Sequence, residues 1–251
     1  WSLPYELGLT KKMMMQFNLM FRKKEKIMSR LLFLCTAVLG LSSTIAFADG
    51  HTQDYSESGY FIFNTLLFLI GGFLVMWMAA GFAMLETGLV RSKNASTQLI
   101  KNVALFSLAS IAYFIVGFNL MYPGDGWIIN GWMGGFSLTG LEPAGVGSDG
   151  VDLTYASVGS DFFFQLMFCA ATASIVSGTV AERVKLWPFL IFTVVLTGIF
   201  YPISASWQWG GGWLSEAGFS DFAGSTVVHA TGAAAALAGA LVIGARHGRY
   251  K

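Results

Sequence analysis

The stretch DFAGSTVVHATGAAAALAGALVIGARHGR, residues 221–249, decides the fold of this chain. Its apolar and small residues continue for the roughly 20 positions that a helix needs to cross a lipid bilayer. Asp221 opens the stretch, and His229 follows about two turns later. An ionisable side chain inside a membrane costs about 3 kcal/mol, so it is a functional candidate by default. The question is what His229 does there.

The rest of the chain has the composition of a membrane protein. Apolar residues make up 55% and charged residues only 12% of the chain, with a mean hydropathy of +0.61. A soluble domain has about twice that charged fraction. The net charge of +1 favours no nucleic-acid partner, and no sequence pattern predicts a cofactor or a metal site.

Five uncharged or nearly uncharged runs predict an all-α integral membrane protein. Each run is long enough to span the hydrocarbon layer, and a helix satisfies its own backbone hydrogen bonds there. Strands of a membrane barrel would be about half as long and would alternate between polar and apolar residues. The runs cover residues 61–85, 103–122, 162–181, 186–207 and 222–245.

The N-terminal part predicts a secretory signal peptide. Residues 1–27 show no usable pattern and are interpreted as an upstream or non-native extension, with Met28 as the true start. Residues 28–48 hold a charged flank, the short apolar core LLFLCTAVLGL and the small-residue cleavage site AFA. We expect cleavage after Ala48, so that Asp49 begins the mature chain; a lone signal-anchor helix is the alternative.

The distribution of charge predicts the orientation. All eight basic residues beyond the signal peptide follow the first, third or fifth run. In the connections after the second and fourth runs, by contrast, every charged residue is acidic. By the positive-inside rule, the N-terminus lies outside and the last residues lie in the cytoplasm. We expect a multi-pass protein of the cell inner (plasma) membrane. The basic residues are Arg91, Lys93, Lys101, Arg183, Lys185, Arg246, Arg249 and Lys251.

His229 shares a predicted helix face with small residues. At 100° per residue, this face allows a neighbouring helix to approach closely, so His229 is expected to face protein or a narrow cavity rather than lipid. A structural histidine remains an equal interpretation. Asp221 has helix capping as its structural interpretation. The small residues are Ser225, Gly232, Ala236, Ala240 and Gly244.

Aromatic residues gather at the outer ends of the runs, in SWQWGGGW and DFFFQLMF. Most such residues belong to the interfacial belt of a membrane protein. The glycines after Trp209 predict a flexible turn beside an aromatic face, where an indole attracts a desolvated cation.

Glu86 and Glu182, at the ends of the first and third runs, are expected to be exposed or to pair with neighbouring loops, without a role in transport.

Three strings resemble the ammonium transporter family of Amt, Mep and Rh proteins: GFAMLETGLVRSKN, FQLMFCAATASIVSGTVAER and DFAGSTVVHATGAAAALAGALVIGAR. The resemblance covers residues 60 to 251 and implies an eleven-helix homotrimer with two five-helix repeats of inverted topology. Residues 49–251 would then form the first repeat, truncated at its C-terminal end.

The resemblance also implies site residues. Trp209 matches the tryptophan of an external ammonium site, and Asp221 matches the acidic residue beneath it. Phe168 matches one of two stacked gate phenylalanines, with Gln165 one turn outward, and His229 matches the first of two pore histidines. The implied function is passage of ammonium or ammonia, with methylammonium as an analogue, under control of a PII-type regulatory protein.

Three alternatives remain open at this point. An ammonium sensor of the same fold would bind the cation with little flux, and a gas channel resembling Rh proteins would conduct ammonia or carbon dioxide. An intramembrane hydrolase would use a serine with His229 and Asp221, but the chain holds no nucleophile turn of the GxSG type.

Overall fold

The computed structural model describes residues 57–138, 146–147, 150–151, 155–246 and 248. These residues belong to one compact unit, Tyr55–Lys251. The expected extension and signal peptide, residues 1–48, lie outside the described residues, as does the expected mature start at Asp49.

Five spans in the described part of the chain are long and apolar enough to cross a membrane, as predicted. The protein is therefore a multi-pass α-helical membrane protein. The spans are Gly59–Leu89, Ser92–Met121, Val158–Thr179, Leu186–Ser206 and Ser225–Ile243.

Most spans are built from more than one helical segment, and short elements connect them. The helical segments are α2 (Glu57–Leu89), η1 (Ser92–Asn94), α3 (Ala95–Ala112), η2 (Tyr113–Gly117), α4 (Phe118–Met121), α5 (Val158–Thr179), α6 (Leu186–Val195), η3 (Leu196–Phe200), α7 (Tyr201–Ser206), α8 (Trp213–Glu216), η4 (Ser225–Ala230) and α9 (Thr231–Ile243). The described strands are very short and form two antiparallel pairs. β1 (Trp127–Ile129) pairs with β2 (Met133–Gly134), and β3 (Val146–Gly147) pairs with β4 (Gly150–Val151).

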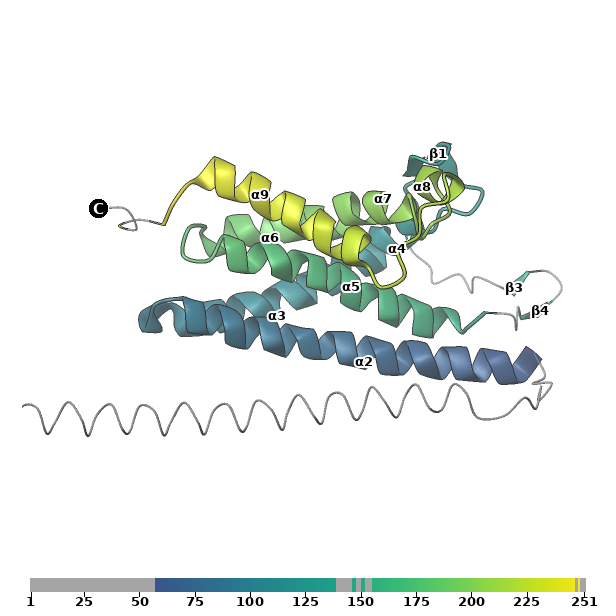
Figure 1. Cartoon of the computed structure of the whole chain (residues 1–251), viewed down its shortest axis with the longest axis horizontal. Helices are drawn as coiled ribbons and strands as arrows, with labels where there is room; N and C mark the ends of the chain where they lie inside the picture. The colour runs from purple at the N-terminus through teal and green to yellow at the C-terminus, as the bar shows by residue number, and fades with distance from the viewer. Residues whose placement is uncertain (1–56, 139–145, 148–149, 152–154, 247, 249–251) are drawn as a thin grey trace, which may run out of the picture. The chain divides into compact units, whose positions relative to one another are not determined.

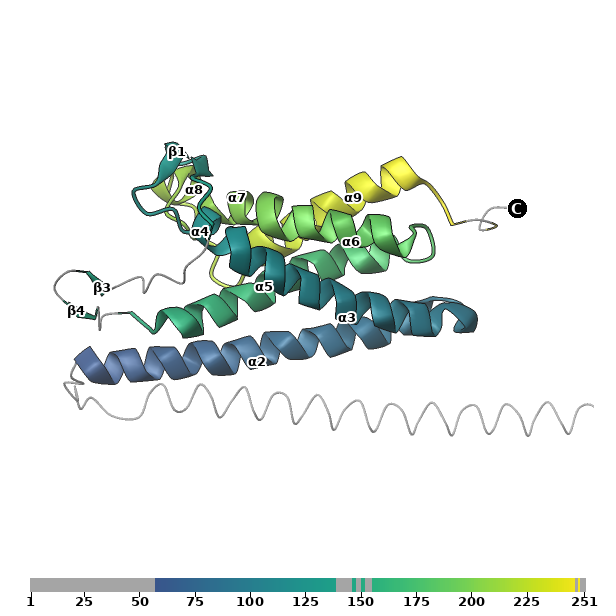
Figure 2. The ribbon, with the colours of Figure 1, turned by 180° about the vertical axis from the view of Figure 1, so that it is seen from behind.

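Helix α5 is the centre of the unit. It packs against α2 and α3 on one side and against α9 on the other, and both views of the ribbon show this order (Figure 1, Figure 2). In the most apolar stretch of α5, 61% of the residues are buried inside the protein, whereas in that of α2 only 6% are buried. The small residues of α5 fit this position, because Ala170, Ala171 and Ala173 let neighbouring helices approach closely.

Three of the five spans contain a π-helix, in which each hydrogen bond closes over one more residue than in an α-helix. These are η2, η3 and η4. Such wide turns are rare and recur at functional sites. They also rotate the residues that follow, so a helical wheel drawn at 100° per residue fails across them.

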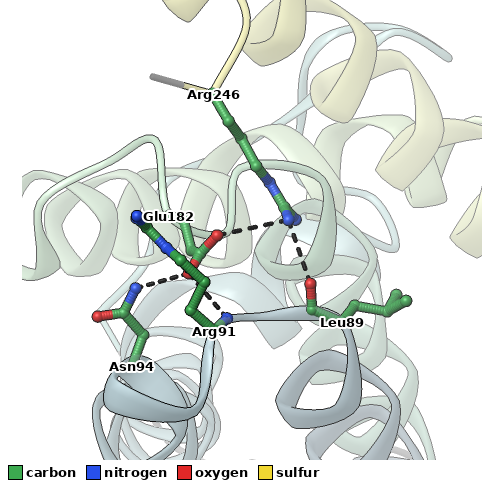
Figure 3. Close-up of polar contacts among 5 residues, drawn as sticks. All are labelled: Leu89, Arg91, Asn94, Glu182 and Arg246. Atoms are coloured by element: carbon green, nitrogen blue, oxygen red, sulfur yellow. Dashed lines mark hydrogen bonds and ion pairs between the residues drawn. The ribbon is translucent and has the colours of Figure 1, made fainter. Parts of the chain in front are cut away.

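A single carboxylate fastens three connections at the end of the unit where the basic residues lie (Figure 3). Glu182 Oε1 accepts hydrogen bonds from the Arg91 backbone N–H at 3.0 Å, from Arg91 Nε at 3.1 Å and from Asn94 Nδ2 at 2.6 Å. Arg246 Nη1 lies 3.5 Å from Glu182 Oε2 and donates to the Leu89 carbonyl at 3.2 Å. The predicted pairing of Glu182 with neighbouring loops is thus confirmed.

These contacts account for the electrostatics of Glu182. The backbone N–H of Arg91 and then the amide of Asn94 lower the pKa of this carboxyl group to about 2, because both donors stabilise the ionised form. Glu182 adopts a positive φ of 61°, which is uncommon for a residue with a side chain, so the hydrogen bonds hold the backbone in an unfavourable conformation.

Glu86 and Lys101 differ from the prediction. Glu86 is only 2% exposed, and its Oε2 accepts hydrogen bonds from Asn102 and Ser177, both at 2.9 Å. Lys101 is only 5% exposed and lies inside α3, where Nζ is 3.9 Å from Glu86 Oε2 and 4.9 Å from the centre of the Phe189 ring. The second span begins at Ser92, earlier than the predicted residue 103. The prediction looked for uncharged runs, so it excluded Glu86 and Lys101, although these two opposite charges compensate each other inside the protein.

We predict that Glu182→Gln destabilises the protein by about 1–2 kcal/mol in detergent, since the amide loses the charge and places N–H groups against Arg91. The pKa of Glu182 is lower in the folded state than in the unfolded state, so the carboxylate stabilises the fold fully above about pH 4.5 and loses this effect as the pH falls towards about 2. Thermal unfolding from pH 8 to pH 3 measures both effects. Glu216→Gln, at an exposed carboxylate of α8, is the control. Equal unfolding temperatures for Glu182→Gln and the wild type at pH 7 would contradict the prediction.

Candidate functional site

An aromatic face lies at the opposite end of the unit. Phe168 projects from α5, and its ring centre is 5.9 Å from that of Trp209, in the turn after α7. Both side chains are partly exposed. The indole Nε1–H of Trp209 donates to the backbone carbonyl of Asp221 at 2.8 Å, which fixes the plane of the indole. The structure thus brings together three of the predicted site residues.

The glycine turn after Trp209 is packed, whereas the sequence predicted a flexible turn. The Gly212 N–H donates to the Ser206 carbonyl at 3.0 Å, and the Trp213 N–H donates to the Gly131 carbonyl at 3.0 Å. A Cβ atom on Gly212 would lie 2.6 Å from the Gly131 oxygen, so this close approach of two backbones needs glycine. The turn is therefore packed and hydrogen-bonded against neighbouring backbone beside the indole.

Asp221 caps the helix that carries His229. Its two carboxylate oxygens accept hydrogen bonds from the four backbone N–H groups of residues 224–227, at 2.7 to 3.1 Å. Burial by itself raises the pKa of this carboxyl group, but the four N–H donors outweigh burial and lower the pKa below its usual value. The capping interpretation of Asp221 is therefore what the geometry shows.

His229 lies in the π-helix η4 and is exposed in the described chain. Its Nδ1 is 3.1 Å from the Gly224 carbonyl oxygen. Because a carbonyl only accepts hydrogen bonds, the neutral ring carries its proton on Nδ1 and leaves Nε2 as a free acceptor.

The predicted helix face of His229 is only partly covered by the described residues. Gly232 and Ala236 are buried, and a Cβ atom on Gly232 would lie 3.0 Å from the Thr172 carbonyl of α5. His229 is instead exposed, as is Ser225, the one small residue of the predicted face that also lies in the π-helix. Gly232 and Ala236 pack α9 on α5, and the histidine faces the open side.

The depth of His229 follows from one polar contact. Thr172 Oγ1 donates to the Phe168 carbonyl at 3.1 Å and lies 3.4 Å from the carbonyl of Val228. The residue next to His229 therefore lies one helical turn beyond Phe168. From the end of the unit inwards, the order is Trp209 with Asp221, then Phe168, then His229.

Gln165 is only 7% exposed and lies one turn before Phe168 on α5. Its Oε1 finds no hydrogen-bond partner among the described residues, and the same holds for Oδ1 of the buried Asp161 one turn earlier. Asp161 was not among the predicted site residues, although a lone aspartate at the start of an apolar run is a signal for it. No group of three histidine, cysteine or acidic side chains suited to a metal occurs in the described ranges.

The fold and the site together define a class of protein. Five membrane-length helices carry a partly exposed aromatic pair and, one turn further along, a histidine, which is the arrangement of a polytopic α-helical membrane protein. A sequence profile of the Ammonium Transporter Family matches residues 66–251. The chain belongs to this family.

Similarity to individual proteins agrees with the family match. The chain is 42% identical over 209 residues to a putative ammonium transporter of Synechocystis sp., covering 82% of this chain and 45% of the relative. It is 40% identical over 230 residues to ammonium transporter Amt2 of Archaeoglobus fulgidus, covering 86% of this chain and 47% of the relative. The chain thus spans about half the length of these curated relatives. They are named transporters, so the hydrolase alternative is set aside.

Solved structures show the same fold. The crystal structure of Mep2 from Saccharomyces cerevisiae matches with a TM-score of 0.62 and 27% identity, covering 72% of this chain and 40% of that chain. Mep2 from Candida albicans matches with a TM-score of 0.62 and 28% identity, covering 76% and 42%.

We predict that Asp221→Ala destabilises the protein by about 2 kcal/mol or more, because the substitution leaves buried backbone N–H groups without an acceptor. Asp221→Asn should be intermediate, since its amide keeps one oxygen. Thermal unfolding in detergent measures the difference. Asp125→Ala, which removes an exposed carboxylate from a turn, is the control and should unfold like the wild type. A wild-type unfolding temperature for Asp221→Ala would show that the four hydrogen bonds carry little stability.

Proposed function

We propose that the protein transports ammonium or ammonia across the membrane, with methylammonium as an analogue. One observation carries the proposal: the indole of Trp209 is held by Asp221 at 2.8 Å and lies beside Phe168, which is one helical turn from the level of His229. Membership of the family and the names of the relatives support it.

Trp209 collects the cation in this proposal. A cation over the face of an indole gains about 2 kcal/mol when water is removed from it. Asp221 acts from behind, because it fixes the indole through its carbonyl and holds the start of η4 through its carboxylate. The carboxylate oxygens already accept hydrogen bonds from backbone N–H groups. The carboxylate therefore attracts the ion through its electric field and not by direct contact.

Phe168 and His229 provide the selectivity. Ammonium and potassium have similar size and charge, but only ammonium can release a proton. An apolar passage disfavours the charged form of an amine, so loss of water at the Phe168 ring favours neutral ammonia. His229 follows with Nε2 free, and this nitrogen can accept a hydrogen bond from ammonia or a proton. Gln165, one turn outward of Phe168, completes the proposed set.

The exposure of His229 supports a larger assembly. An imidazole on a membrane helix is costly unless it faces protein or a water-filled path. We propose that it faces a second five-helix repeat of inverted topology, which would place the path near the middle of the bilayer. The basic end of the unit is then cytoplasmic and the aromatic end is external. A homotrimer and a PII-type partner, as the family resemblance implies, are part of the same proposal.

We predict that Trp209→Leu weakens saturable uptake more at low than at high ammonium, because the lost cation–π energy of about 1–2 kcal/mol lowers apparent affinity several-fold. Uptake of labelled methylammonium by cells that lack their own transporters measures this, with the protein produced from its complete gene. Trp187→Leu, at an exposed tryptophan of α6, is the control. Unchanged concentration dependence would remove Trp209 from the site. Binding without flux in the wild type would instead identify a sensor.

We predict that His229→Ala lowers ammonium flux sharply or removes selectivity against potassium, because the passage loses the group that handles the proton. Uptake with and without excess potassium measures both effects, and the amount of assembled protein in the membrane is measured alongside. Wild-type flux and selectivity would show that His229 is structural. Failure to assemble would show the same.

A further inference from the structure

Four aromatic rings form a continuous row from Phe68 on α2 to the proposed cation site. Phe168 contacts Trp209 on one side and Phe164 on the other, where the ring centres are 4.9 Å apart at an angle of 78°. Phe164 in turn stacks on Phe68 of α2, at 5.1 Å and 19°. Each ring limits the orientation of the next, because aromatic pairs prefer stacked or edge-to-face geometry.

The position of Phe164 depends on a glycine. A Cβ atom on Gly71 of α2 would lie 2.7 Å from Cε2 and 3.3 Å from Cδ2 of Phe164. The Phe164 ring therefore occupies the space that a side chain at position 71 would fill. Gly71 is one turn from Phe68 on the same helix, so α2 provides both a bare backbone and a ring for Phe164 to pack against.

The next glycine offers a contrast. A Cβ atom on Gly72 would lie 2.5 Å from Cε1 of Phe163, which is a closer approach than the one at Gly71. Phe163 packs against Phe73, with ring centres 5.1 Å apart, and within the described part of the chain this ring pair does not include a ring of the row. Both glycines allow α2 to pack on α5, but only Gly71 borders a ring of the row.

We propose that Gly71 is a positioning residue for the cation site formed by Phe168 and Trp209. Its missing side chain lets Phe164 stack between Phe68 and Phe168, and this stack sets the orientation of the Phe168 ring. The inference rests on the proposed function, because it assumes that the Phe168–Trp209 pair binds ammonium. It adds that a residue of α2 with no side chain tunes the affinity of that pair.

A methyl group at position 71 has a specific consequence. The Phe164 ring must rotate or withdraw, because contacts of 2.7 Å are not tolerated. Its edge-to-face contact with Phe168 is then lost, and Phe168 gains freedom beside Trp209. The loss of one aromatic pair corresponds to a roughly two- to tenfold weaker apparent affinity. The maximal rate should change less, because the substitution leaves the path beyond Phe168 unaltered.

The test compares Gly71→Ala, Gly72→Ala and Gly81→Ala in uptake of labelled methylammonium, with the protein produced from its complete gene. Gly81 lies on the same helix, with no atom of the described chain within 4 Å of a Cβ placed there, so it reports only the effect of alanine on α2. Gly71→Ala should raise the concentration for half-maximal uptake by about two- to tenfold. Gly72→Ala should lower thermal stability without this rise, and Gly81→Ala should change neither.

A double substitution separates positioning from folding. In Phe164→Leu the ring atoms that oppose position 71 are absent, so adding Gly71→Ala should cause no further loss of affinity. Phe68→Leu provides a variant without a clash, and it should weaken affinity in the same direction. If Gly71→Ala does not fold, the double variant and Phe68→Leu still test the proposal. Wild-type affinity in Phe68→Leu, together with a lower affinity in the double variant than in Phe164→Leu alone, would overturn it.

The outcomes are distinguishable from failure of the proposed function. Equal affinity losses in Gly71→Ala and Gly72→Ala, or none in Gly71→Ala while Trp209→Leu weakens uptake, would overturn the positioning role alone. If Trp209→Leu leaves affinity unchanged, the cation site itself is absent and the positioning role is overturned with it.

Discussion

The carboxylate of Asp221 is the contact on which the scaffold and the candidate site both depend. It accepts hydrogen bonds from the four backbone N–H groups of residues 224–227, which would otherwise lack acceptors at the start of a membrane helix. Its backbone carbonyl accepts the indole N–H of Trp209. One residue thus fixes the direction in which the helix of His229 begins and the plane of the tryptophan above it, so the separation of the two side chains is set by a single anchor.

Buried charge follows the same logic at the basic end. The cost of placing Glu86 and Lys101 among helices is offset because each lies within reach of the other and of polar groups from α3 and α5. Glu182 works closer to the surface, where it gathers donors from the corner between α2 and α3 and from the segment after α9. Both clusters join elements that are far apart in sequence, so they hold the helices in one relative arrangement.

The spans could be predicted because the cost of unpaired charge in lipid leaves long uncharged runs in the sequence. The same rule placed Lys101 outside a span, since it cannot recognise a charge whose partner lies on another helix. The meeting of Trp209 with Asp221 was expected from the family resemblance rather than from the pattern of residues. The glycine turn was misjudged, because flexibility was inferred from composition while the neighbouring backbone of Gly131 decides it. Ring contacts between α2 and α5 are properties of packing that no local pattern contains.

The π-helix at residues 225–230 has a consequence for sequence length. Each of its hydrogen bonds encloses one residue more than an α-helical bond does, so it amounts to a single insertion absorbed within one turn. Deleting one residue before His229 would allow an ordinary α-helix with the same register for Gly232 and Ala236 on α5. The residues before the deletion, with the Asp221 cap among them, would then turn about the helix axis relative to that packed face. Chain length within this turn thus determines how the cap and the histidine are oriented towards each other.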